Sequence, residues 1–124
     1  MPVKESNKQK SWMIKFWLPV FLCMSFIFFA SSIPGNSIPR LFPFQSSLFH
    51  LSVYLCLCFF LIRALRKSHP NIAPAKVIVF TIVFGVIYGI IDELHQAFVP
   101  FRTVSGFDLF IDSLGSVIGS LIYR

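Results

Sequence analysis

Four apolar stretches alternate with short polar segments along this chain of 124 residues. A helix that crosses the hydrocarbon core of a bilayer needs roughly 20 mostly apolar residues. The pattern predicts such helices at about residues 16–33, 48–65, 77–98 and 107–123. Strands are not expected, because an isolated strand in lipid leaves its backbone groups without hydrogen bonds. The predicted fold class is therefore all-α, a polytopic transmembrane bundle of four helices.

Composition supports lipid as the solvent for most of the chain. Hydrophobic residues make up 56% of it, charged residues only 13%, and 16 residues are Phe. Soluble domains carry about 25% charged residues, and a chain this small cannot hide so much apolar surface in its own interior. We expect a basic N-terminal tail, residues 1–15, followed by one transmembrane domain, residues 16–124.

The formal charge of +6 does not indicate nucleic-acid binding. The basic residues stand in short flanks between the apolar stretches, with no polar face that would follow a phosphate backbone. They are Lys4, Lys8, Lys10 and Lys15 before the first span, Arg63, Arg66, Lys67 and Lys76 between the second and third, and single arginines elsewhere, Arg40, Arg102 and Arg124. By the positive-inside rule this alternation predicts that both termini are cytoplasmic.

The first apolar stretch also has features of a signal peptide. It follows a basic segment and ends in the small residues Ala30, Ser31 and Ser32. The stretch is longer than the usual apolar region of a signal peptide, so we expect a retained helix. Cleavage would leave the topology of the other three helices unchanged.

Four of the five acidic residues lie in one segment: Asp92, Glu93, Asp108 and Asp112. Ionisable groups at membrane depth are costly and are functional-site candidates by default. At 1.5 Å per residue, Asp92 lies roughly 22 Å from Val77, near the outer interface, and Asp112 lies about 18 Å from the chain end, which is deeper. A buried carboxylate at that depth is expected to be protonated, paired or bound to a metal.

Helical spacing sorts the polar residues of this segment into faces. One face of the third helix carries Tyr88, Asp92 and Gln96, with Glu93 beside it, and one side of the fourth carries Ser105, Asp108 and Asp112. Each helix also has a pair of glycines four residues apart, Gly85 with Gly89 and Gly115 with Gly119. Small residues at this spacing let backbones approach closely, so we predict a tight hairpin of these two helices that brings the acidic faces together.

The second helix is predicted to complete the site. His50 and Tyr54 are four residues apart near its outer end, at the level of the acids. A purely structural alternative is an ion-pair lock of Glu93, Arg102 and Asp108 that holds the hairpin. One arginine cannot neutralise four carboxylates, so protons, a cation or a cationic ligand are expected as well.

The segment from Tyr88 to Gly119 resembles the signature of the VanZ-like membrane proteins. The matching positions are Tyr88, Gly89, Glu93, Gln96, Phe98, Pro100, Arg102, Ser105, Asp108, Gly115 and Gly119, and the pair of His50 and Tyr54 is similar too. Asp112 stands where members usually have Asn, and Ser46-Ser47 replaces a common Asp-Lys pair. The family is named for a protein that gives low-level teicoplanin resistance. The resemblance implies a bacterial cytoplasmic-membrane protein with a cell-envelope role and no defined reaction.

Three functions stay open from the sequence. The first is an outward-facing site that binds a lipid-linked envelope precursor or a glycopeptide, with Arg40 and Arg102 meeting its anionic groups. The second is an enzyme acting on an envelope lipid, with Glu93 or Asp108 as general base. A small proton-coupled exporter ranks last, because the polar groups gather at one end of the helices.

No cofactor is certain from the sequence. If a cation binds, the candidate ligands Glu93, Asp108 and Asp112 offer hard oxygen donors that favour Mg²⁺ or Ca²⁺ over zinc. Membrane lipids are the expected surroundings, and exposed small-residue faces would permit an oligomer without requiring one.

Overall fold

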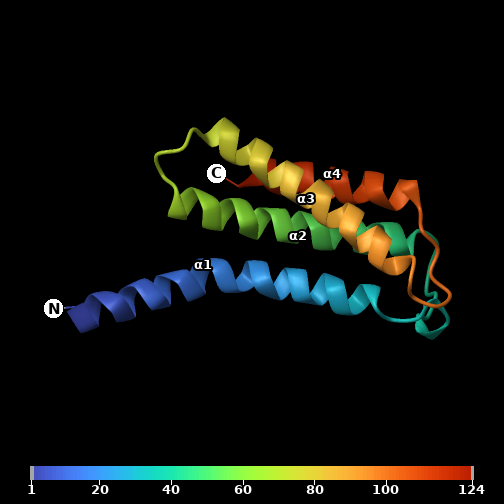
Figure 1. The fold of residues 1–124 in the computed structure, drawn as a ribbon. Coiled ribbons are helices and arrows are strands. Elements are labelled where there is room, and N and C mark those ends of the chain that lie inside the picture. The colour runs from blue at the N-terminus through green and yellow to red at the C-terminus, as the bar shows by residue number, and fades with distance from the viewer. Residues whose placement is uncertain (1, 124) are drawn as a thin grey trace.

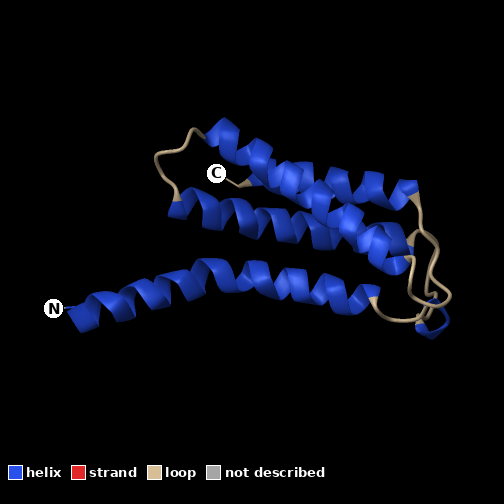
Figure 2. Ribbon diagram, viewed as in Figure 1, coloured by secondary structure: helices blue, strands red, loops and turns tan. Residues whose placement is uncertain are grey.

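The computed structural model describes residues 2–123, and within that range it contains helices and loops but no strand (Figure 2). The helices are α1 (Pro2–Ser31), the short 3-10 helix η1 (Gly35–Ser37), α2 (Gln45–Ser68), α3 (Pro74–Gln96) and α4 (Gly106–Ile122). The all-helical fold predicted from the sequence is confirmed.

Three helices, α1, α2 and α3, are long and apolar enough to cross a membrane. The fourth, α4, has 17 residues and would extend about 26 Å, slightly less than the roughly 30 Å of a typical hydrocarbon core. The chain is therefore a membrane protein, in which α4 packs against the longer, apolar helices α2 and α3.

Three helices, α1, α2 and α3, begin before the predicted spans, in polar sequence. α1 begins at Pro2 and not near residue 16, so the basic segment that precedes the first span is helical. α2 runs from Gln45 to Ser68, and α3 begins at Pro74, whose fixed φ suits the first helical turn. Apolarity marks the part of a helix that suits lipid, whereas Lys, Gln and Glu are good helix formers that continue it into water.

Consecutive helices run in opposite directions (Figure 1). The connections α1–α2 (residues 32–44) and α3–α4 (residues 97–105) meet at one end of the bundle, which we call the loop end. There the backbone N–H of Gly35 donates to the carbonyl of Pro100 at 3.0 Å, which ties the two connections together. The start of α1, the end of α4 and the α2–α3 connection all lie toward the opposite end, where α1 extends away from the other helices (Figure 1).

Glycines let α4 lie against two neighbours at once. A Cβ at Gly119 would sit 2.3 Å from the carbonyl oxygen of Leu55, and one at Gly115 would sit 2.7 Å from that of Leu51, so α4 touches the backbone of α2. A Cβ at Gly85 of α3 would sit 2.2 Å from Ser116 Oγ of α4. The predicted close approach is correct, but the glycines of α4 serve α2 and only those of α3 serve the α3–α4 contact.

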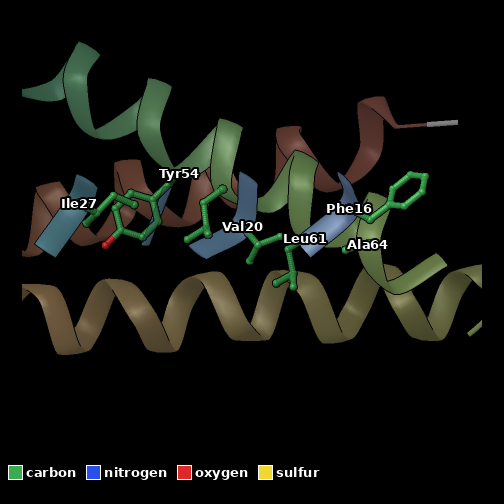
Figure 3. Packing of buried hydrophobic residues seen from close by; sticks show 7 residues of the cluster. Phe16, Val20, Ile27, Tyr54, Leu61 and Ala64 are labelled. Atoms are coloured by element: carbon green, nitrogen blue, oxygen red, sulfur yellow. The ribbon is translucent and has the colours of Figure 1, made fainter. Parts of the chain in front are cut away.

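The apolar core joins α1 to α2. Figure 3 shows side chains of the two helices meeting along their length: Phe16, Val20, Ile27, Tyr54, Leu61 and Ala64. The outer face of α1 stays uncovered, with Phe29 68% exposed and Phe21 59% exposed. Such a face suits lipid, because acyl chains solvate apolar side chains that water does not.

Candidate functional site

Buried polar side chains gather near the loop end of this apolar bundle, and all four long helices contribute. We call the group the polar cluster: Ser31, His50, Tyr54, Asp92, Glu93, Gln96 and Asp112. Every member is at most 5% exposed. Because unpaired polar groups are costly away from water, the partners of each member define what the site can do.

His50 of α2 and Asp112 of α4 form the centre of the polar cluster. His50 Nδ1 lies 2.7 Å from Asp112 Oδ1, and both side chains are buried. The contact exists because Gly115, one turn beyond Asp112, lets α4 approach α2 at this depth. Among residues 2–123 this is the only contact of ion-pair length between a basic and an acidic side chain, and it is an ion pair when His50 is protonated. Removing one partner of a buried ion pair typically costs about 3–5 kcal/mol.

Asp92 of α3 is fully paired, and its partners lie on α1 and α2. Oδ1 accepts from Ser31 Oγ and Oδ2 accepts from the Tyr54 hydroxyl at 3.3 Å. Gln96 Nε2 donates to the same Ser31 oxygen at 3.3 Å, and the Tyr88 hydroxyl donates to the Met24 carbonyl of α1 at 2.7 Å. The predicted face of Tyr88, Asp92 and Gln96 is therefore real, but it points to α1 and α2 and not to α4.

Glu93 provides the link from α3 to α4. Its Oε2 accepts the backbone N–H of Ser105 at 3.1 Å. Ser105 is the N-cap of α4, and its Oγ accepts from the N–H of Asp108 at 3.4 Å, as capping serines do. The other carboxylate oxygen, Glu93 Oε1, is buried without a partner among the described residues, and so is Asp112 Oδ2.

Arg102 does not neutralise the acids. Its Nε donates to the Ile33 carbonyl at 2.9 Å, and its Nη2 donates to the Ala30 carbonyl at 2.6 Å. It thus holds the carboxyl end of α1, where carbonyls lack helical partners and a cation is favourable. The ion-pair lock of Glu93, Arg102 and Asp108 considered from the sequence does not form.

A pocket of about 770 Å³ lies over the polar cluster at the loop end. Its polar lining comprises Arg40, Gln45, Ser46, His50, Gln96, Arg102, Thr103 and Asp108, and most of the rest is apolar or aromatic. His50 and Gln96 belong to both the pocket and the polar cluster, so the cluster forms part of the pocket floor.

Two residues of the pocket wall have left-handed backbone. Phe44 and Phe101 both have φ of 61°, and they are the only described non-glycine residues with positive φ. Both line the pocket. Such conformations cost about 1–3 kcal/mol and collect at functional sites, where surrounding structure enforces them.

Sequence reasoning missed the contribution of α1. Ser31 was visible only as a small residue at the end of an apolar stretch, yet it contacts both Asp92 and Gln96. Asp108, in contrast, was predicted to meet the acids of the third helix, and it lies half-buried on the pocket wall. Whether the first helix is cleaved stays a prediction.

The fold and the site define a class: a small helical membrane protein with a polar pocket near one end of its bundle. Residues 16–124 match the VanZ/LLP1 family, and the chain belongs to that family. The resemblance seen in the segment from Tyr88 to Gly119 is thereby confirmed over nearly the whole chain. No curated protein and no solved structure is a match for this chain.

Proposed function

We propose that this VanZ-family protein acts in the bacterial cell envelope by binding the anionic headgroup of an envelope lipid or lipid-linked precursor in the loop-end pocket. The observation that carries the proposal is the pocket itself, whose wall holds the cations Arg40 and Arg102 and whose floor holds the polar cluster. In the orientation predicted from the basic flanks, this pocket faces the outside of the cell.

The charges of the pocket support an anionic ligand. Arg40 is exposed and its guanidinium is a natural partner for phosphate, to which arginine donates two parallel hydrogen bonds. Arg102 brings a second positive charge to the wall while its hydrogen bonds hold α1. A diphosphate between the two would be attracted by both charges.

The apolar wall supports a ligand with a lipid tail. Leu41 is 76% exposed and Phe44 is 80% exposed, and both line the pocket beside Phe42. Exposed large apolar residues next to a polar floor fit an amphiphile whose headgroup enters the pocket and whose chain lies along the helices. Gln96 and Asp108 would accept or donate hydrogen bonds to hydroxyl and amine groups of the headgroup.

The proposal is tested by measuring the binding of a polyprenyl diphosphate to the purified chain in nanodiscs. Arg40→Ala should weaken binding about 10- to 100-fold, because a charged hydrogen bond is worth about 1.5–3 kcal/mol. Lys67→Ala is the matched control, since Lys67 is a cation at the opposite end of α2. Equal affinity for the wild type and Arg40→Ala would overturn the proposal.

Altered glycopeptide susceptibility would be a consequence of this binding. A protein that holds a lipid-linked precursor at the outer face changes how much of it teicoplanin can reach. Expression in a susceptible host should raise the inhibitory concentration of teicoplanin, and Arg40→Ala should abolish the increase at equal protein level. An increase in the inhibitory concentration that persists in Arg40→Ala would mean that resistance does not depend on ligand binding in the pocket.

A second candidate function is catalysis on the same lipid, and the His50–Asp112 contact favours it. A histidine held by a carboxylate at 2.7 Å and open to a pocket is an arrangement used for general bases. Release of phosphate or headgroup from the bound lipid by wild type, lost in His50→Gln, would establish an enzyme. Binding without turnover would establish a binding protein.

A further inference from the structure

Three side chains that ligate metals in other proteins converge from three helices. His50 of α2, Glu93 of α3 and Asp112 of α4 each offer a ligand atom, and these atoms all lie within 4.8 Å of one another. All three residues are at most 5% exposed. Buried ligands on rigid helices form a defined enclosure, unlike a chance group of acids on a surface.

The enclosure contains carboxylate oxygens that nothing in the described chain satisfies. Glu93 Oε1 and Asp112 Oδ2 are buried and make no hydrogen bond. Asp92 does not share this deficit, because Ser31 and Tyr54 pair both of its oxygens. Glu93 and Asp112 are therefore the two carboxylates of the polar cluster that each have a buried oxygen without a hydrogen-bond donor or cation.

Within residues 2–123, no side chain near the enclosure supplies enough positive charge. Arg102 is committed to the carbonyls at the end of α1, and His50 contributes at most one charge against two carboxylates. An isolated buried carboxylate is strongly unfavourable, so a cation in this enclosure would remove a large cost.

We propose that His50, Glu93 and Asp112 bind one divalent first-row metal ion, with Zn²⁺ preferred. The sequence suggested Mg²⁺ or Ca²⁺ because its candidate ligands were three carboxylates, Asp108 included. The structure replaces Asp108 by His50, and one imidazole with two carboxylates suits zinc better than the all-oxygen ions.

The observed spacing fits a zinc site. Tetrahedral ligands about 2.1 Å from zinc lie about 3.4 Å from one another. This value falls between the 2.7 Å of the His50–Asp112 contact and the 4.8 Å that encloses all three ligand atoms. The metal would replace the proton between His50 and Asp112, and the hydrogen bond from Ser105 would hold Glu93 in place.

The fourth position of the metal would face the pocket. His50 lines the pocket as well as the enclosure, so water or an anionic oxygen of a pocket ligand has access to the ion. Three protein ligands with one exchangeable position is the arrangement in which zinc polarises a bound group. The site is inferred from these ligands alone and does not depend on which lipid binds.

The test uses metal alone, without lipid. The full chain, purified in detergent with a tag free of histidine and stripped with EDTA, is titrated with Zn²⁺ against a chromophoric chelator. Wild type should bind one zinc per chain, and Glu93→Gln and Asp112→Asn should each weaken binding by about 100-fold or more, since each removes a ligand oxygen or its charge. The control is Glu5→Gln, which neutralises an exposed acid in the first turn of α1, at the other end of the bundle, and should bind zinc like wild type.

Folding of each variant is checked by circular dichroism and thermal unfolding of the metal-free protein. If a folded variant binds zinc more weakly, the loss is then due to the missing ligand and not to unfolding. Zinc affinity unchanged in Glu93→Gln and Asp112→Asn would overturn the site, and so would absence of zinc binding by folded wild type. Binding of Mg²⁺ or Ca²⁺ in preference to Zn²⁺ would overturn the choice of metal. Lipid binding by the stripped protein is measured separately, so failure here leaves the proposed function to its own test.

Discussion

Asp112 is the residue on which the interior of the polar cluster depends most. It is fully buried, it pairs with His50 through one oxygen, and its other oxygen has no partner in the described chain. That His50 stands level with the acids could be predicted from the alternation of basic flanks. The contact itself could not, because it depends on the rotation of α4, which the backbone contacts of Gly115 and Gly119 with α2 determine.

Removing the Asp112 side chain should destabilise the protein more than neutralising it. Asp112→Ala leaves His50 buried without its partner and should cost about 3–5 kcal/mol in unfolding free energy. Asp112→Asn keeps an oxygen that accepts from His50 and should cost clearly less. Unfolding by denaturant in detergent, without added metal, measures both. Equal losses in the two variants would mean that the hydrogen bond contributes little.

Arg102 should matter for the fold of α1 and not for the metal enclosure. Arg102→Ala removes two charged hydrogen bonds to the Ala30 and Ile33 carbonyls, each worth about 1.5–3 kcal/mol, and should lower the unfolding temperature. Zinc affinity of the folded protein should stay within a few-fold of wild type. A large gain of zinc affinity without loss of stability would mean that Arg102 lies at the acids and competes with the ion, which would contradict its observed contacts with the α1 carbonyls.

At the scale of elements, close helix contact decides which residues meet. The glycine spacing predicted that backbones would approach, and it could not reveal the partner, because a pair of small residues fits any neighbouring helix. In the structure α4 packs on α2 through its own glycines and on α3 through Gly85. The first two helices are longer than the predicted spans for a related reason. Apolarity marks the stretch suited to lipid, whereas α1 and α2 continue through Lys, Gln and Ser.

Enlarging Gly119 should separate α4 from α2. Its Cβ would meet the Leu55 carbonyl at 2.3 Å, a backbone atom that cannot rotate away. Gly119→Ala should lower the free energy of unfolding by about 1–3 kcal/mol and Gly119→Val by more. Gly106→Ala is the control, because a Cβ there meets nothing within 4 Å. If both positions tolerate alanine equally, the close packing of α4 on α2 is wrong.

At the scale of the whole molecule, topology determines where the pocket opens. The structure puts the start of α1 and the end of α4 at one end and the pocket at the other (Figure 1). The apolar stretches predicted the all-helical bundle, and the alternating basic flanks predicted that both termini lie on the same side of the membrane. The pocket could not be predicted, because the loop residues that form it, such as Phe42 and Phe101, follow no periodic pattern.

Reporter fusions test the predicted orientation. A fluorescent protein fused after Arg124 should fold and fluoresce, because we predict a cytoplasmic C-terminus from the basic flanks. Alkaline phosphatase inserted in the α1–α2 connection should be active, because the loop end should face outward. Phosphatase activity at the C-terminus, with none in the connection, would mean that the orientation is opposite to the predicted one and that the pocket faces the cytoplasm.

The central claim, that the loop-end pocket binds a lipid headgroup, is tested most directly by photo-crosslinking. A polyprenyl diphosphate with a diazirine beside its diphosphate is added to the chain in nanodiscs, and the labelled residues are mapped by mass spectrometry. Labels should fall on pocket residues of the two loop-end connections, around Arg40 and Phe101, and unlabelled lipid should compete them away. Labels confined to residues 66–74 at the opposite end, or spread without competition, would contradict the claim.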